Sequence, residues 1–332
     1  MSTPPDPHAL HDLHAPGSLY APPDPHAPSS LRGPGVEELA RIIRTALDED
    51  LGGDPGTDVT TTATVPPDAR AVVEVRLREA GVVAGQVVWA PLLAEAARRL
   101  GQDAPVVELL VADGRRGRPG DVLARLSGPT RSLLVAERTG LNLVGRACGV
   151  ATATRAWVDV LAGTGVQVLD TRKTTPGLRA WEKYAVRCGG GVNKRIGLFD
   201  VAMVKDNHAA AAGSVVAAYR AVRSSAPDVA VEVEVESTEV ALDVVRAGGR
   251  FLMCDNMTSE QLTATVTAVH ALVRELDGPD GRVLVEATGG LTLGRAPEIA
   301  ATGVDFVSVG ALTHSAPQLD VGLDWLGRTD RA

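Results

Sequence analysis

The sequence predicts an α/β protein in which a mixed α/β domain precedes an α/β barrel of parallel strands. After Val150, short runs rich in Val and Leu alternate with helical segments, which is typical of parallel strands joined by right-handed crossovers. Each run ends in polar residues or glycine. Of the 332 residues 45% are apolar and only 3% aromatic, so Val, Leu and Ala must build the core, as in buried parallel sheets.

Residues 1–35 differ from the rest. They are rich in Pro, His and Asp, and the hexapeptide PPDPHA occurs at 4–9 and again at 22–27. Such a segment buries little apolar surface, so we expect it to be disordered. It holds four of the seven histidines, for which we expect no catalytic role.

The first folded domain is expected over 36–140. Apolar residues at helical spacing begin at Val36, and an alternating stretch over 71–77 predicts a strand. Further elements are expected as a helix over 87–100, strands over 106–111 and 122–126, and a long helix from Pro129 to about Ala147. The C-terminal segment 313–332 could pack on this domain.

The barrel domain is expected over 141–312. Its strands are predicted at 166–170, 201–205, 229–236, 250–255, 283–287 and 305–310. Its helices are predicted at 178–186, 214–224, 238–247 and 259–275. A doubly wound sheet is the alternative, but no Gly-x-Gly-x-x-Gly follows the first strand, which weakens a dinucleotide-binding version. Polar residues at six strand ends favour the barrel, because there these ends meet on one face.

Positive charge is concentrated at these strand ends. The whole chain has a net charge of −8, which argues against bulk attraction to nucleic acid or anionic membranes. Eight basic and only three acidic residues nevertheless lie between Asp170 and Lys205. Three of them recur at helical spacing and are expected on a solvated helix face: Arg179, Lys183 and Arg187. Four others follow strands or a glycine loop and are expected to bind anions: Arg172, Lys173, Arg195 and Lys205.

Glycine loops and a carboxylate strand complete the pattern. The loop 189–195 places three glycines before Lys194 and Arg195. Gly289, Gly290 and Gly310 follow the last two strands, where α/β barrels commonly bind phosphate. Glu232, Glu234 and Glu236 share one strand face, expected to point inward. Glu234 and Asp255 could therefore hold Mg²⁺ or accept hydrogen bonds from sugar hydroxyls.

Location is predicted from what the sequence lacks. No basic region followed by an apolar run opens the chain, and no stretch reaches the ~20 apolar residues of a spanning helix. The three cysteines are far apart in the sequence, which fits a reducing compartment. We therefore expect a cytoplasmic protein.

These residues resemble the quinolinate phosphoribosyltransferase family, the carboxylating nicotinate-nucleotide pyrophosphorylases. The most specific matches are DTRKTTPGLR from Asp170 and KDNH from Lys205. Weaker ones are ERTGLN from Glu137, the loop 189–195, Asp255-Asn256, 286–290 and 309–312. The resemblance covers 36–323. It implies an N-terminal α/β domain and an open α/β barrel, assembled as a homodimer or hexamer.

The resemblance also implies an activity. Family members transfer phosphoribose from phosphoribosyl pyrophosphate to quinolinate with Mg²⁺, releasing CO₂ and pyrophosphate and forming nicotinate mononucleotide for NAD biosynthesis. By this resemblance the catalytic residues are Lys173, Lys205, Glu234 and Asp255, and the last two also hold the metal. Substrate contacts extend to Thr171, Arg172, Lys194, Arg195, Gly289, Gly290 and Gly310, and Arg138 is contributed across the subunit interface.

One position departs from the family pattern, and three alternatives stay open. Many members have His where this chain has Lys194, which keeps a cation but loses a group that titrates near neutral pH. A paralogue acting on another pyridine carboxylate is the first alternative. A Schiff-base lyase that uses Lys205 is the second. A non-catalytic nucleotide sensor is the third.

Overall fold

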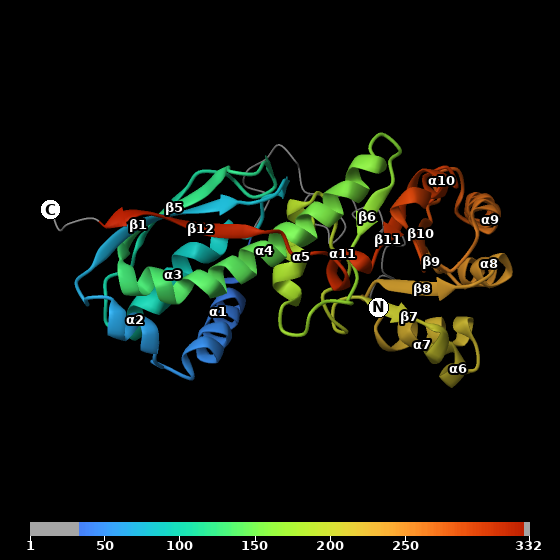
Figure 1. The fold of residues 1–332 in the computed structure, drawn as a ribbon. Helices are drawn as coiled ribbons and strands as arrows, with labels where there is room; N and C mark the ends of the chain where they lie inside the picture. Colours follow the sequence, from blue (N-terminus) through green and yellow to red (C-terminus); the bar gives the residue numbers. More distant parts are fainter. Residues whose placement is uncertain (1–32, 329–332) are drawn as a thin grey trace. The chain divides into compact units, whose positions relative to one another are not determined.

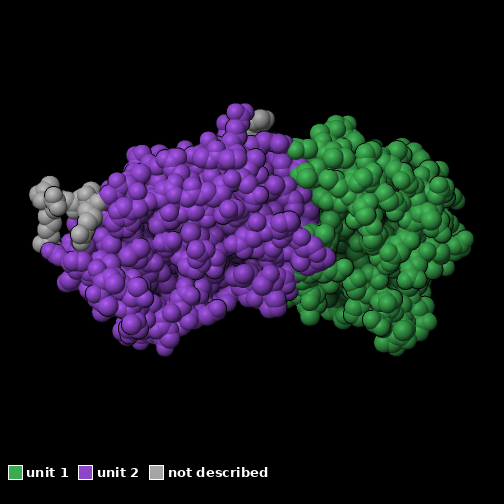
Figure 2. Space-filling model, in the orientation of Figure 1, with its two compact units in different colours: residues 1–22, 156–173, 191–311 green, residues 23–155, 174–190, 312–332 purple. Residues whose placement is uncertain are grey.

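Two sheets organise the chain in the computed structural model, which describes residues 33–328. The described residues divide into two units, which Figure 2 shows in different colours. One contains 156–173 and 191–311, and the other contains 33–155, 174–190 and 312–328. The predicted tail 1–35 lies almost wholly outside the described residues, and the boundary expected between residues 140 and 141 falls within one long helix.

The sheet of the N-terminal unit is antiparallel, in the order β12-β1-β5-β3 (Figure 1). Strand β12 comes from the C-terminal end of the chain and pairs with β1. The unit's elements are α1 (Val36–Leu51), α2 (Val59–Thr64), β1 (Arg70–Leu77), β2 (Gly81–Val82), η2 (Gln86–Val88), α3 (Trp89–Leu100), β3 (Val106–Leu109), β4 (Arg116–Gly117), β5 (Val122–Pro129), most of α4 (Thr130–Val160), α5 (Arg179–Cys188), most of α11 (Ala311–His314) and β12 (Val321–Arg328).

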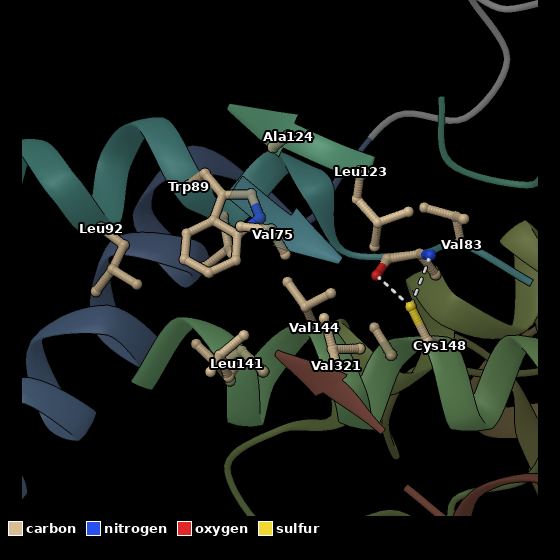
Figure 3. Packing of buried hydrophobic residues seen from close by; sticks show 14 of the residues in the cluster. Val75, Val83, Trp89, Leu92, Leu123, Ala124, Leu141, Val144, Cys148 and Val321 are labelled. Atoms are coloured by element: carbon tan, nitrogen blue, oxygen red, sulfur yellow. Dashed lines mark hydrogen bonds between the residues drawn. The ribbon is translucent and has the colours of Figure 1, made fainter. Parts of the chain in front are cut away.

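The core of this unit packs helices against the sheet. Figure 3 shows Trp89 and Leu92 of α3 beside Val144 of α4 and Val75 of β1, all fully buried. The Cys148 thiol bonds to the backbone of Ala84, accepting from its N–H at 3.2 Å and lying 3.3 Å from its carbonyl oxygen. Cys148 is therefore a small core residue, as the other buried cysteines are.

The second sheet has six parallel strands in the order β6-β11-β10-β9-β8-β7 (Figure 1). β6 and β7 lie at opposite edges, so the barrel is open. The predicted fold class is confirmed. The unit's elements are β6 (Gln167–Leu169), β7 (Ala202–Val204), α6 (Asp206–Ala212), α7 (Val215–Ser225), β8 (Val231–Val235), α8 (Thr238–Arg246), β9 (Phe251–Asp255), α9 (Ser259–Asp277), β10 (Leu284–Thr288), η3 (Leu293–Arg295), α10 (Ala296–Ala300) and β11 (Phe306–Ser308).

Side-chain caps explain where the barrel helices begin. Ser214, Ser237 and Thr258 precede α7, α8 and α9, and each side chain accepts a hydrogen bond from the backbone N–H three residues later. Such caps satisfy donors that the first helical turn leaves free. All six predicted strands and four helices of this region are present, with ends shifted by a few residues. Within the described part of the chain, no helix is long and apolar enough to cross a membrane.

Candidate active site

An apolar layer, called the floor below, lies in the barrel interior. Phe251, Phe306, Leu169 and Val192 form one buried cluster, and the two phenyl rings are 5.7 Å apart. The parallel bridge between Leu169 and Val192 brings the glycine loop alongside β6. Polar side chains at the carboxyl ends of the strands therefore stand above a packed floor.

A buried ion cluster lies above this floor. Nζ of Lys194 lies 2.7 and 2.6 Å from the two carboxylate oxygens of Glu286 and 3.2 Å from Glu232 Oε2. Lys194 is 4% exposed and both glutamates 0%. Burial lowers the pKa of Lys194, but Glu286 and Glu232 outweigh it, so this pKa lies above its ordinary value. The ammonium therefore stays charged and compensates the carboxylates.

Cations and carboxylates meet at the rim. Lys205, after β7, ion-pairs with Glu234 of β8, whose side chain is 9% exposed. Burial raises the pKa of Asp255, as does the charge of Glu234, while Lys205, Asn256 and Lys173 lower it; the net direction is upward. Lys173, Lys205 and Glu234 thus all lie close enough to Asp255 for their charges to act on it, and the four residues come from four separate strand ends.

Asp170 links the glycine loop to the end of β6. Its carboxylate accepts hydrogen bonds from Nδ2 of Asn193 at 2.7 Å and from the backbone N–H of Lys194 at 2.8 Å, and Asp170 is fully buried. Arg195 follows directly, and its Nη1 donates to the carbonyl of Val201 at 3.4 Å. The loop that carries Arg195 is therefore attached to the strand end that carries Arg172.

The segment after β6 presents two more predicted residues. The hydroxyl of Thr171 accepts a hydrogen bond from the backbone N–H of Lys173 at 3.0 Å, which shapes the turn. Arg172 is half-buried, and its Nε has no hydrogen-bond partner among the described residues. A buried donor without a partner is costly unless a ligand accepts from it.

The glycines after β10 allow a close approach of two loops. Gly289 has φ +85° and Gly290 has φ +57°, backbone conformations that other residues rarely adopt. A Cβ on Gly289 would lie 2.4 Å from Oδ1 of Asn256. Gly310 lies directly before the short helix α11. Gly290 is exposed, and Gly289 and Gly310 are half-buried. Phosphate binding by their backbone stays a prediction.

Arg138 belongs to the other unit. It is exposed on α4 and lines a hollow together with Asp50, Asp58 and Val135. Thr139, its neighbour, donates a hydrogen bond to Asp50 at 2.8 Å. The expectation that Arg138 serves another subunit stays a prediction.

Two expectations about charged residues are wrong. Lys183 was expected on a solvated helix face with Arg179 and Arg187, but it is 2% exposed because nearly all of α5 is buried. Glu236 was expected to point inward with Glu232 and Glu234. β8 ends at Val235, so the alternation no longer applies to Glu236, which is exposed.

Sequence reasoning missed the partners of Lys194. Glu286 stands in the apolar run Val283–Ala287 and was noted only as part of a strand end. A carboxylate inside such a run signals a buried counter-ion, because an unpaired buried charge is very costly. A second buried carboxylate, Glu182 of α5, forms an ion pair with Arg146 at 2.7 Å.

The fold and the rim define an α/β-barrel protein that carries cations and carboxylates at the carboxyl ends of its strands. Residues 150–324 match the family described as quinolinate phosphoribosyl transferase, C-terminal domain, and residues 58–148 match its N-terminal domain. The chain therefore belongs to the quinolinate phosphoribosyltransferase family, as its motifs predicted, and is a pentosyltransferase of an NAD biosynthesis enzyme family.

Individual relatives agree with this assignment. The nicotinate-nucleotide pyrophosphorylase [carboxylating] of Mycobacterium leprae is 48% identical over 282 residues, covering 85% of this chain and 95% of the relative. A probable enzyme of the same name from Bacillus subtilis is 38% identical, covering 82% and 89%. The crystal structure of NadC from Streptococcus pyogenes superposes with a TM-score of 0.78 at 36% identity, covering 88% of this chain and 99% of that one.

Proposed function

We propose that this chain transfers phosphoribose from phosphoribosyl pyrophosphate to the ring nitrogen of quinolinate with release of pyrophosphate. Loss of CO₂ from the adduct, with a proton from solvent taking its place on the ring, then gives nicotinate mononucleotide. The observation that carries the proposal is the meeting of Lys173, Lys205, Glu234 and Asp255 at one rim. The substrates bear carboxylates, a phosphate and a diphosphate, so a pocket with fixed cations is needed to collect them.

In the proposed reaction, basic residues would bind the substrate anions and acidic residues would act on the ribose. Arg172, Arg195 and Lys205 would hold the quinolinate carboxylates, and Lys173 would contact substrate anions or pyrophosphate. The 5′-phosphate would bind to the backbone at Gly289, Gly290 and Gly310. Nitrogen attack builds positive charge at the anomeric carbon, which the carboxylates of Glu234 and Asp255 stabilise through their field. Once alkylated, the ring nitrogen withdraws electrons and favours loss of the adjacent carboxylate.

Magnesium fits this proposal. The described residues contain no group of three His, Cys, Asp or Glu side chains that could hold a metal ion by themselves. Mg²⁺ is usually held by one or two carboxylates together with substrate phosphates, and Glu234 and Asp255 are such a pair. Burial and the charge of Glu234 raise the pKa of Asp255, and a cation bound beside the two carboxylates would reduce the repulsion between them. When bound, the ion would neutralise diphosphate charge.

The assembly and location belong to the same proposal. A homodimer or hexamer would let Arg138, exposed on α4, reach the substrate of a neighbouring subunit. The cytoplasm is the proposed compartment, because three free cysteines fit a reducing environment.

The test is turnover with defined substrates. Purified protein with Mg²⁺ should consume quinolinate and phosphoribosyl pyrophosphate, release CO₂ and form nicotinate mononucleotide, while nicotinate in place of quinolinate should release no CO₂. Arg172→Ala should largely abolish turnover, because a half-buried ligand for a carboxylate is lost. Wild-type protein that consumes neither substrate refutes the proposal, and preferred use of another pyridine carboxylate favours the paralogue.

The Schiff-base alternative is less well supported. A lysine that attacks a carbonyl needs a neutral amine, which a desolvated setting or neighbouring cations favour and a carboxylate partner opposes. Lys205 is 42% exposed and ion-paired with Glu234. Borohydride trapping with keto acids should therefore leave Lys205 unmodified.

A further inference from the structure

Lys194 stands beside the proposed quinolinate ligand Arg195 but is oriented differently. Its side chain is 4% exposed and runs into the barrel interior, where Nζ contacts Glu286, Glu232 and Met253. A group bound in this way has little surface left for a substrate. Two fully buried carboxylates and one ammonium give the cluster a formal charge of −1. Removing the ammonium would leave both carboxylates buried and unpaired, which is strongly destabilising.

The backbone on both sides of Lys194 is also fixed. Asp170 receives the N–H of Lys194 and the amide of Asn193. On the other side, the Asp200 carboxylate accepts from the backbone N–H groups of Ile196 at 2.6 Å and Gly197 at 3.1 Å. Arg195 therefore lies between two backbone anchors, Asp170 and Asp200, and the side chain of Lys194 in the ion cluster is a third attachment.

We propose that Lys194 is a positioning residue: it ties the glycine loop to Glu232 and Glu286 inside the barrel and so presents Arg195 to the substrate carboxylate, without binding substrate itself. This proposal rests on the proposed function for the identity of the substrate, but the anchoring itself does not. On this proposal the Lys194 ammonium neutralises carboxylates inside the protein and does not bind quinolinate.

A compensation experiment separates anchoring from binding. Lys194→Met removes the ammonium and leaves two buried carboxylates unpaired, so the melting temperature should fall and the KM for quinolinate should rise about tenfold or more. The KM for phosphoribosyl pyrophosphate should change less than about threefold. The triple variant Lys194→Met, Glu232→Gln, Glu286→Gln removes the charges together.

If Lys194 only anchors, the triple variant should regain most of the melting temperature, because amides in place of carboxylates need no cation. Its quinolinate KM should stay raised, because the tie between the glycine loop and the barrel interior is lost. The double variant Glu232→Leu, Glu286→Leu keeps the ammonium but removes both of its acceptors, so its quinolinate KM should also rise about tenfold or more. A double variant whose quinolinate KM lies within about threefold of wild type overturns the proposal, since the ammonium then acts without the tie.

Lysine labelling of the unaltered protein gives an answer that does not depend on the variants' folding. The chain has four lysines, of which Lys173 and Lys205 lie at the rim and Lys183 and Lys194 are buried. Under reductive methylation followed by peptide mass spectrometry, Lys205 should react and be protected by quinolinate. Lys194 should react at least about tenfold more slowly, with or without quinolinate. Lys194 labelling at the rate of Lys205 overturns the proposal.

The two proposals fail in different ways. Wild-type protein that forms no product from quinolinate contradicts the proposed function, but the labelling rate of Lys194 in the free protein still reports whether its amine is held in the interior. Normal turnover together with rapid labelling of Lys194 contradicts the anchoring alone.

Discussion

Asn256 occupies the space that a side chain on Gly289 would need. Oδ1 of Asn256 lies 2.4 Å from the position of a Cβ on Gly289, and the Asn256 N–H donates to the carbonyl of Thr288 at 3.0 Å. Asn256 itself has φ 54°, a value in the left-handed region. Two loop residues with left-handed backbone conformations, Asn256 after β9 and Gly289 after β10, are thus packed against each other at the rim, beside the proposed phosphate site.

Gly289→Ala should weaken binding of phosphoribosyl pyrophosphate. The new Cβ must displace Asn256, and φ +85° is strained for alanine, so we expect a loss of about 1–2 kcal/mol in unfolding free energy and a KM raised about tenfold. Gly294→Ala is the matched control, because nothing lies within 4 Å of its Cβ and its φ is not positive. Equal kinetics in the two variants would show that the glycine is needed only as a turn.

Lys205→Met should lower kcat/KM for quinolinate about hundredfold or more, because the proposed carboxylate ligand and the partner of Glu234 are lost together. Steady-state kinetics measure it. The control is Arg246→Met, which breaks an exposed ion pair with Asp243 of 2.9 Å, where 58% and 61% of the side chains are exposed. A Lys205→Met enzyme as active as this control would place the site elsewhere.

Arg146→Met should destabilise the N-terminal unit by about 3–5 kcal/mol, because Glu182 is fully buried and would lose its counter-ion. Glu182 Oε1 also accepts from the Thr175 hydroxyl at 2.7 Å. Adding Glu182→Gln should restore part of the loss, and denaturant unfolding of both variants measures the coupling.

The comparison for this pair is Arg41→Met, which removes an exposed partner of Glu38 with 45% and 39% of the side chains exposed. Its unfolding free energy should change by less than about 1 kcal/mol. Similar losses from the two arginine variants would mean that burial of the Arg146 pair contributes nothing.

Glu95 should make stability depend on acid pH. Hydrogen bonds from Arg98 lower its pKa from 4.5 to about 2, with Arg99 adding to the effect and burial opposing it. Because this pKa is depressed by folding, the carboxylate stabilises above pH 4.5, and the benefit is lost as pH falls from 4.5 toward 2. Solvent screens a surface group, so we expect about 1 kcal/mol.

Urea unfolding of Glu95→Gln against wild type should therefore show a destabilisation at pH 7 that shrinks by pH 3. Glu275→Gln, at an exposed position of α9, is the control and should show no such trend. A destabilisation by Glu95→Gln that is the same at both pH values would mean that packing of the side chain, and not its charge, matters.

Much of the architecture was determined locally, by the sequence itself. The apolar runs and the capping residues Ser214, Ser237 and Thr258 place strands and helices within a few residues of their observed ends. The regular alternation determined a parallel sheet, and the polar strand ends located the rim with Lys173, Lys205, Glu234 and Asp255. These features are local because backbone geometry and solvent exposure repeat with fixed periods along the chain.

Only the tertiary structure decided which charges meet and which are buried. Lys194 looks like any other loop cation in the sequence, and its pairing with Glu286 depends on two segments 92 residues apart entering one interior. Lys183 has the spacing of a solvated face, yet α5 is buried nearly all round. Burial and ion pairing are set by which elements pack together, and the free energy of a charge depends on that surrounding far more than on its neighbours in sequence.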